Sequence, residues 1–153
     1  MPTEILVPLD YTEESRKALE FASALAVQLG LGLTLLHFWQ CPPVARHAKA
    51  AHPESGAPTP IADLLVAGAK AELSGFVSQV SIPAEVRVKS ELREGNPTEE
   101  IITLSQSGAY SWIVMGTRGH TGLSHLMHGS TAEGVVRLSP IPVITVPLAK
   151  AQA

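Results

Sequence analysis

Two kinds of segment alternate along the chain: short apolar runs, and longer stretches whose apolar residues recur at helical spacing. The short runs are rich in Val, Ile and Leu and predict buried strands at residues 5–7, 33–39, 86–88, 112–115 and 143–146. The longer stretches predict helices that begin near residues 12, 61, 97 and 130. This alternation predicts an α/β fold, an open five-stranded parallel sheet with helices on both faces.

Local signals mark where several of these helices begin and end. Thr12 is a predicted N-cap, and Gly30 follows the last apolar position of the same helix. Asn96-Pro97 combines a capping side chain with the residue favoured at the first helical position. Ser130 and Glu133 have the spacing of a capping box, so a further helix is expected to start there.

Residues 40–60 depart from the alternating pattern. This segment contains five prolines among small residues and scattered charges, which predicts a surface loop. We expect one domain over residues 1–153, with this Pro-rich loop at its surface. Pro142 and Pro147 bracket the last predicted strand and place it at an edge of the sheet.

Charge and cysteine content narrow the classes of partner. The formal net charge is −3, which gives no reason to expect nucleic acid or an anionic membrane as a partner. Cys41 is the only cysteine, as is typical of a reducing compartment. The first residues lack the basic and apolar pattern of a secretion signal. We therefore expect a cytoplasmic protein that binds neither nucleic acid nor membrane.

The clearest candidate for chemistry is a glycine-punctuated loop between the fourth strand and the fourth helix. Glycines allow a backbone to approach a phosphate closely, and a helix start offers free N–H groups and the positive end of the helix dipole. The loop has neither the Gly-Lys-Ser/Thr of a P-loop nor a dinucleotide fingerprint. It predicts an anion site formed by Gly116, Gly119, Gly129, Ser130 and Thr131.

Two charged residues are further candidates for this site, since Asp10 would lie beside the glycine loop if the first and fourth strands are neighbours. Asp10 follows the first strand and could accept hydrogen bonds from ribose hydroxyls, help to hold a divalent cation, or bond its own turn. Arg118 could pair with phosphate oxygens or point into solvent. No further ligand completes a tetrahedral metal site with His120, His125 and His128, which argues against a structural zinc. We interpret these histidines as exposed loop residues, and as cations they could assist phosphate binding at lower pH.

The spacing Gly-x-x-Gly-x9-Gly-Ser from Gly116 to Ser130 resembles the ATP-binding branch of the universal stress protein family. Segments 7–10, 95–97 and 142–146 also resemble that family, so the similarity spans nearly the whole chain. The resemblance implies a Rossmann-like, adenine-nucleotide alpha hydrolase-like fold. It also implies bound ATP with Mg²⁺ or Mn²⁺, and a homodimer formed through the edge strand Val143 to Val146.

The resemblance assigns roles to individual residues. Asp10 would contact the nucleotide near its ribose and meet a metal ion only through Mg-ATP, with no metal site made by the protein alone. Pro8 and Met115 would pack around the adenine, and the backbone of Phe38 would bond the edge of the base. Ribose and phosphates would be held by Gly116, Gly119, Gly129, Ser130 and Thr131, with Arg118 as a further candidate.

The leading functional hypothesis is a dimeric regulator of stress response or growth arrest that is switched by bound adenine nucleotide. One alternative is a dimeric interaction scaffold with weak or no nucleotide binding. Another is a slow ATPase, although the sequence indicates no poised general base and no arginine–lysine pair for a transition state. Enzyme status stays open at this stage.

Overall fold

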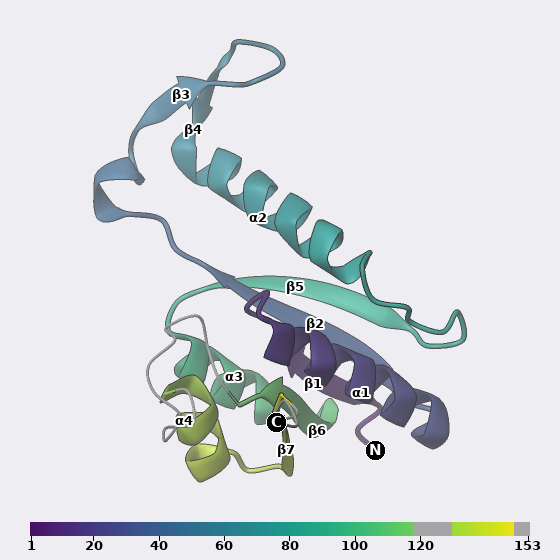
Figure 1. Ribbon diagram of the computed structural model, residues 1–153. Coiled ribbons are helices and arrows are strands. Elements are labelled where there is room, and N and C mark those ends of the chain that lie inside the picture. Colours follow the sequence, from purple (N-terminus) through teal and green to yellow (C-terminus); the bar gives the residue numbers. More distant parts are fainter. Residues whose placement is uncertain (118–129, 149–153) are drawn as a thin grey trace, which may run out of the picture.

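The computed structural model describes residues 1–117 and 130–148. Secondary structure follows the chain in this order: β1 Glu4–Pro8, α1 Glu13–Leu29, β2 Gly32–Trp39, the 3-10 helix η1 Pro43–Ala45, β3 Lys49–Ala51, β4 Pro58–Pro60, α2 Ile61–Val77, β5 Val88–Glu94, α3 Pro97–Ser105, β6 Tyr110–Gly116, α4 Ser130–Leu138 and β7 Val143–Val146 (Figure 1). Within these ranges, no helix is both long enough and apolar enough to span a membrane.

The main sheet has five parallel strands in the order β5-β2-β1-β6-β7. Helices α1 and α2 cover one face, and α3 and α4 cover the other (Figure 1). This confirms the predicted open parallel sheet with helices on both faces. The order also places β7 at an edge, as its flanking prolines predict, and makes β1 and β6 neighbours.

Each face of the sheet has its own apolar core. On one side, strand residues such as Ile5, Leu33 and Leu35 pack against the stripe of α1. On the other side, Leu6, Ile113 and their neighbours pack against α3 and α4. Because β1, β2 and β6 are covered on both faces, almost every position in them is apolar, and the period-two alternation of a half-exposed strand is absent there.

The predicted helix ends agree with the structure where it describes them. The Thr12 side chain accepts a hydrogen bond from the Ser15 N–H at 3.2 Å, and Asn96 accepts one from the Glu99 N–H at 3.2 Å. Gly30 ends α1 with φ 66°, a left-handed conformation that glycine adopts without strain. These caps fix where α1 and α3 begin, and therefore how their first turns meet the sheet.

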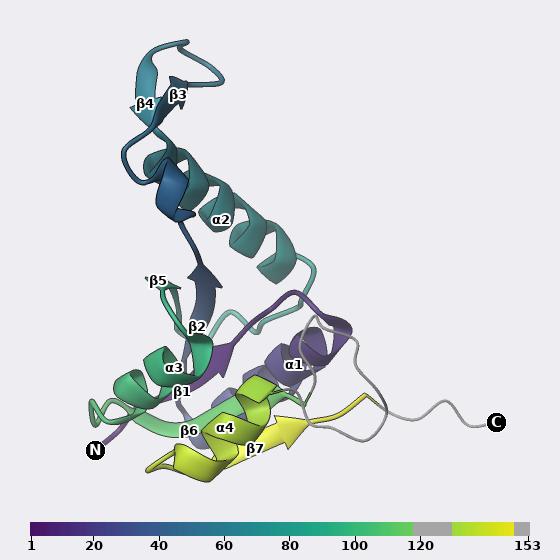
Figure 2. The ribbon, with the colours of Figure 1, turned by 90° about the vertical axis from the view of Figure 1, so that its left-hand side faces the viewer.

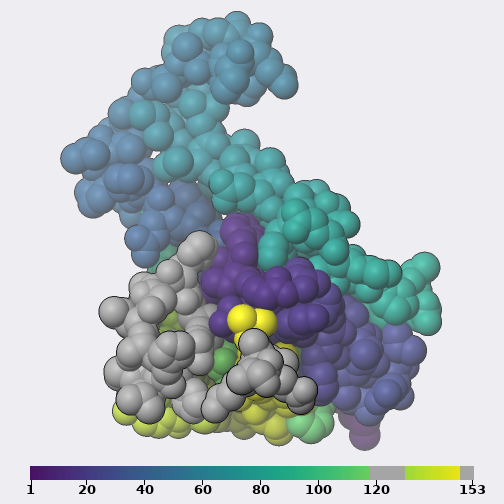
Figure 3. Space-filling model, viewed as in Figure 1, coloured from purple at the N-terminus to yellow at the C-terminus, as the bar shows by residue number. Residues whose placement is uncertain are grey.

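Two predictions about residues 40–94 were wrong in detail. In chain order, the third strand of the main sheet is β5, Val88–Glu94, whereas the sequence predicted this strand at residues 86–88. The sequence did not predict the full extent of β5, because β5 is an edge strand whose side chains are exposed or half-exposed and mostly polar. The predicted loop at 40–60 contains η1 and an antiparallel hairpin of β3 and β4. This hairpin and the start of α2 project from the body of the molecule (Figures 2 and 3).

A buried carboxylate lies at the start of β1. Glu4 accepts hydrogen bonds from the Thr34 hydroxyl and the Lys89 ammonium group. Burial alone raises the pKa of Glu4, but the bonds from Lys89 and Thr34 outweigh it and hold that pKa below its ordinary value of 4.5. Since the folded pKa is the lower one, the ionised carboxylate contributes stability above pH 4.5, and this contribution is lost as pH falls through the folded pKa.

Lys89→Met is therefore expected to lower the free energy of unfolding at neutral pH by about 1 kcal/mol, a value kept small because the lysine is largely exposed. The variant should also lose less stability than wild type on acidification below pH 4.5. Urea unfolding at neutral and acid pH measures both effects. Lys17→Met, which removes an exposed ion pair with Glu20 on α1, is the control. Equal behaviour of the two variants would contradict this account of Glu4.

Candidate functional site

A pocket opens at the carboxyl ends of β1, β2 and β6. Strand order reverses between β1 and β6, and ligands of open α/β sheets bind at such a reversal. The pocket is lined by Pro8, Leu9, Asp10, Ser15, Phe38, Pro97, Met115, Gly116, Thr131 and Ala132. The position of the pocket follows from the fold alone, because all five parallel strands have their carboxyl ends on this side of the molecule.

The structure brings many of the predicted site residues together in this pocket: Pro8, Asp10, Phe38, Met115, Gly116 and Thr131. Ser130 begins α4 and is exposed, but it is not among the lining residues. Arg118, Gly119, Gly129 and the three loop histidines fall in residues 118–129, outside the part of the chain that the structure describes.

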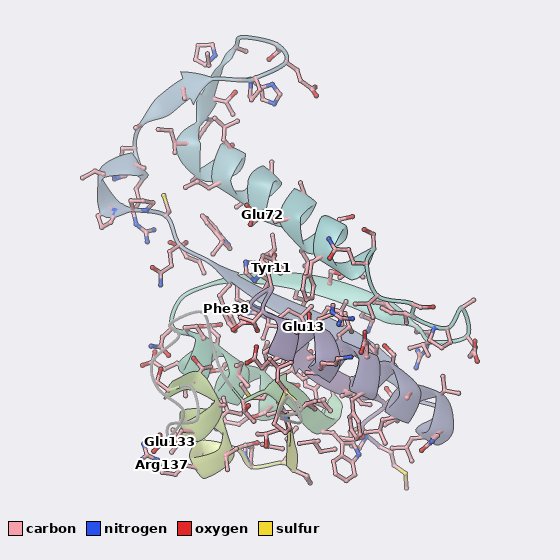
Figure 4. The ribbon with its side chains drawn as sticks, viewed as in Figure 1. Tyr11, Glu13, Phe38, Glu72, Glu133 and Arg137 are labelled. Atoms are coloured by element: carbon pink, nitrogen blue, oxygen red, sulfur yellow. The ribbon has the colours of Figure 1, made fainter. Side chains whose placement is uncertain are left out.

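Apolar side chains from four elements form the walls of the pocket. Pro8 ends β1, Met115 is the penultimate residue of its neighbour β6, and Phe38 comes from β2. Pro97, the first residue of α3, adds a further apolar side chain, and α3 packs on the same face of the sheet as Met115 and Phe38. Figure 4 shows Phe38 near the end of β2, and Phe38 shares the pocket with Ser15 of α1. This apolar slot favours a largely apolar group.

Three helices begin at this pocket. Ser15 lies in the first turn of α1, Pro97 opens α3, and Thr131 and Ala132 lie in the first turn of α4. A helix start carries unpaired N–H groups and partial positive charge. The polar end of the pocket is therefore suited to an anion, although no single lysine or arginine lines it among the described residues.

Asp10 has two roles in this geometry. Its Oδ1 accepts hydrogen bonds from the Thr12 N–H at 3.1 Å and from the Thr12 hydroxyl, so it holds the turn that leads into α1. Its side chain also lines the pocket. Within the described residues Oδ2 has no hydrogen-bond donor, so it remains available to a ligand. The turn role of Asp10 is therefore compatible with the ligand roles that the sequence left open, because the turn uses only Oδ1.

Gly116 is required by packing as well as by the pocket. A Cβ atom at this position would lie 2.8 Å from Glu14 Cβ and 3.0 Å from the Glu14 carbonyl carbon. The end of β6 therefore approaches the first turn of α1 more closely than any residue with a side chain permits. The sequence argument assigned this glycine to phosphate approach alone and missed its contact with the helix.

Sequence reasoning did not identify Leu9, Ser15, Pro97 and Ala132 as pocket residues. Pro97 and Ser15 carried a usable signal, since both lie in the first turn of a predicted helix. In a parallel sheet the helices that follow strands begin at the carboxyl edge, where ligands bind. Ala132 lies two residues after Ser130 and could have been found by the same argument.

Comparison with known proteins agrees with this fold. The model of the universal stress protein family matches residues 1–147. The chain belongs to the universal stress protein family. Universal stress protein YxiE of Bacillus subtilis is 31% identical over 153 residues, which cover 95% of this chain and 99% of the relative. The structure of universal stress protein UspA from Lactobacillus plantarum superposes with a TM-score of 0.68 at 26% identity, covering 94% of this chain and 97% of that chain.

Two more distant family members were solved with nucleotides. A universal stress protein from Archaeoglobus fulgidus in complex with dAMP has a TM-score of 0.63 at 20% identity and covers 95% of this chain and 98% of that chain. A universal stress protein in complex with cAMP has a TM-score of 0.64 at 14% identity and covers 97% of this chain and 98% of that chain. At these identities the likeness shows a shared fold.

Gly116→Ala is expected to destabilise the protein by about 1–3 kcal/mol, because the new methyl group collides with the backbone of α1. Gly75→Ala is the matched control. A Cβ at Gly75 meets nothing within 4 Å, so alanine should stabilise α2 by up to about 1 kcal/mol. Urea unfolding of both variants measures the difference. If Gly116→Ala unfolds at the same denaturant concentration as wild type, β6 and α1 are not in this close contact.

Proposed function

We propose that this universal stress protein belongs to the ATP-binding branch of its family and binds an adenine nucleotide in the pocket at the β1/β6 reversal. One observation carries the proposal: the first turns of α1, α3 and α4 converge on an apolar slot. The slot suits a purine base, and the helix starts suit phosphates. Few other classes of ligand combine a flat apolar ring with a polyanion.

The orientation of the nucleotide that we propose is the one implied by the family resemblance, and the lining of the pocket is compatible with it. The adenine lies between Phe38, Met115 and Pro8, and the backbone at Phe38 bonds its edge. The ribose lies near the free oxygen of Asp10. The phosphates extend toward Gly116 and toward Thr131 in the first turn of α4. The dAMP and cAMP complexes of other family members support an adenine nucleotide as the class of ligand.

A divalent cation accompanies the phosphates in this proposal. The first turn of α1 carries Glu13 and Glu14, that of α3 carries Glu99 and Glu100, and α4 carries Glu133. These carboxylates partly cancel the attraction of the helix starts for phosphate. Mg²⁺ or Mn²⁺ bound to ATP would restore the balance, with Asp10 within reach of the ion through the nucleotide. No cluster of three potential protein ligands for a metal occurs within residues 1–117 and 130–148.

The function we propose is a cytoplasmic, homodimeric regulator of stress response or growth arrest that the bound nucleotide switches. The two other readings are slow hydrolysis of ATP and a scaffold with weak nucleotide binding. The edge strand β7 supports the dimer, because within the described chain it pairs only with β6 and leaves its other side free for a second copy.

Asp10→Asn tests the nucleotide site. Asparagine keeps an oxygen for the Thr12 turn but replaces the free carboxylate oxygen with an NH₂ group, so affinity for Mg-ATP should fall about tenfold or more. Asp63→Asn, on the exposed first turn of α2, is the control and should bind as wild type does. Titration calorimetry measures all three proteins. Undetectable binding by wild type would sink the nucleotide proposal, and equal affinity of wild type and Asp10→Asn would remove Asp10 from the site.

Thr145→Lys tests the dimer. Thr145 is an exposed residue of β7, and a lysine on an edge strand opposes pairing with another strand. Light scattering should give a dimer mass for wild type and a monomer mass for the variant. Ser81→Lys, at an exposed position between α2 and β5, is the control and should remain dimeric. A variant that keeps the dimer mass would exclude edge pairing through β7.

A further inference from the structure

Tyr11 has an unusual backbone conformation beside the pocket. It lies between Asp10, which lines the pocket, and Thr12, which caps α1. Its φ is 65°, and it is the one non-glycine residue with positive φ in the described part of the chain. An aromatic residue in this left-handed region is strained, whereas glycine would adopt the same turn freely. Something about the Tyr11 side chain must offset this strain.

The Tyr11 ring is held on the side of the turn away from the pocket. It stacks on His37 with 4.2 Å between ring centroids and an interplanar angle of 26°, and it packs against Phe76 of α2 at 5.2 Å. His37 is itself fixed, since its Nδ1 lies 2.9 Å from the Leu9 carbonyl oxygen. Figure 4 shows Tyr11 in the space between α2 and β2, below Glu72. Residues of two other elements, β2 and α2, therefore hold this one ring in place.

The Tyr11 hydroxyl contributes little to this arrangement. It is buried and has no hydrogen-bond partner among the described residues. Burial, together with the charge of Glu72, raises the pKa of Tyr11 to about 12, so the phenol stays neutral at physiological pH. A buried, unpaired hydroxyl does not stabilise the fold. The aromatic ring is therefore the part of the side chain that holds the turn.

We infer that Tyr11 is a positioning residue for the nucleotide pocket: its ring, clamped between His37 and Phe76, holds the strained turn that directs Asp10 into the pocket and sets Thr12 at the start of α1. This inference rests on the proposed function, because the ligand of Asp10 is the nucleotide. The turn is then preorganised before the ligand arrives, and binding does not have to order it.

Three substitutions separate the ring, the hydroxyl and the backbone strain. Tyr11→Phe keeps the ring and removes the unpaired hydroxyl, so it should bind Mg-ATP within about twofold of wild type and melt at the same or a higher temperature. Tyr11→Ala removes the ring, and affinity should fall about tenfold, which is the cost of ordering roughly one residue on binding. Tyr11→Gly relieves the strain and should regain stability relative to Tyr11→Ala, without regaining affinity.

Hydrogen exchange provides a readout that does not depend on the ligand. The Thr12 amide donates to Asp10, and the Ser15 amide donates to Thr12, so both report on the turn directly. In Tyr11→Ala their exchange should accelerate more than that of amides in β1 and β6. Tyr11→Phe should leave it unchanged. Phe21→Ala, which removes an exposed aromatic ring from α1, is the control for loss of a ring elsewhere.

The affinities and the exchange rates together decide whether Tyr11 positions the turn. Reduced affinity and faster local exchange in Tyr11→Ala and Tyr11→Gly, with Tyr11→Phe like wild type, support the positioning role. Wild-type affinity in folded Tyr11→Ala overturns it, and so does an equal loss in Tyr11→Phe, which would assign the effect to the hydroxyl. If wild type binds no nucleotide, the proposed function fails. The positioning of Asp10 and Thr12 by the ring then stands or falls on the exchange of Thr12 and Ser15 alone.

Discussion

The close contact between Gly116 and the first turn of α1 is the constraint on which the pocket depends. Glu14 Cβ would lie 2.8 Å from a Cβ at position 116, so only glycine lets the end of β6 meet the start of α1. A similar contact joins the helices on the other face, where a Cβ at Gly134 of α4 would lie 2.9 Å from Thr98 Cγ2 of α3. These two glycines allow three helix starts to converge at the carboxyl ends of the strands.

The proposed chemistry follows from this convergence and from the apolar strand ends beside it. Strands buried on both faces end in apolar residues, and Pro8, Phe38 and Met115 therefore present an apolar slot to the pocket. The helix starts add positive potential next to that slot. The acidic residues in the same first turns limit this potential, which favours a ligand that brings its own cation. An adenine nucleotide with Mg²⁺ or Mn²⁺ meets all of these conditions.

The sequence predicted the sheet because buried strands and helix caps have local signatures, whereas the pocket residues Pro8, Phe38 and Met115 were named only through the family resemblance. Thr12, Gly30 and Asn96 act within a few residues of themselves, so their roles could be deduced without a structure. The position of β5 could not, because an exposed edge strand lacks an apolar run. The hairpin in residues 40–60 and the packing role of Gly116 depend on segments that are distant in the sequence. The strain at Tyr11 was equally hidden, since it is offset by His37 and Phe76 from other elements.

The most direct test of the central claim is to map amide chemical shifts by NMR while Mg-ATP is added to the ¹⁵N-labelled protein. The account predicts saturable shifts at Asp10, Phe38, Gly116 and Thr131, which come from four elements or turns but line one pocket. Amides in the exposed hairpin of β3 and β4 should not move. Shifts confined to residues outside the pocket, or no shifts at all, would contradict the claim that the pocket at the carboxyl ends of the strands is a nucleotide site.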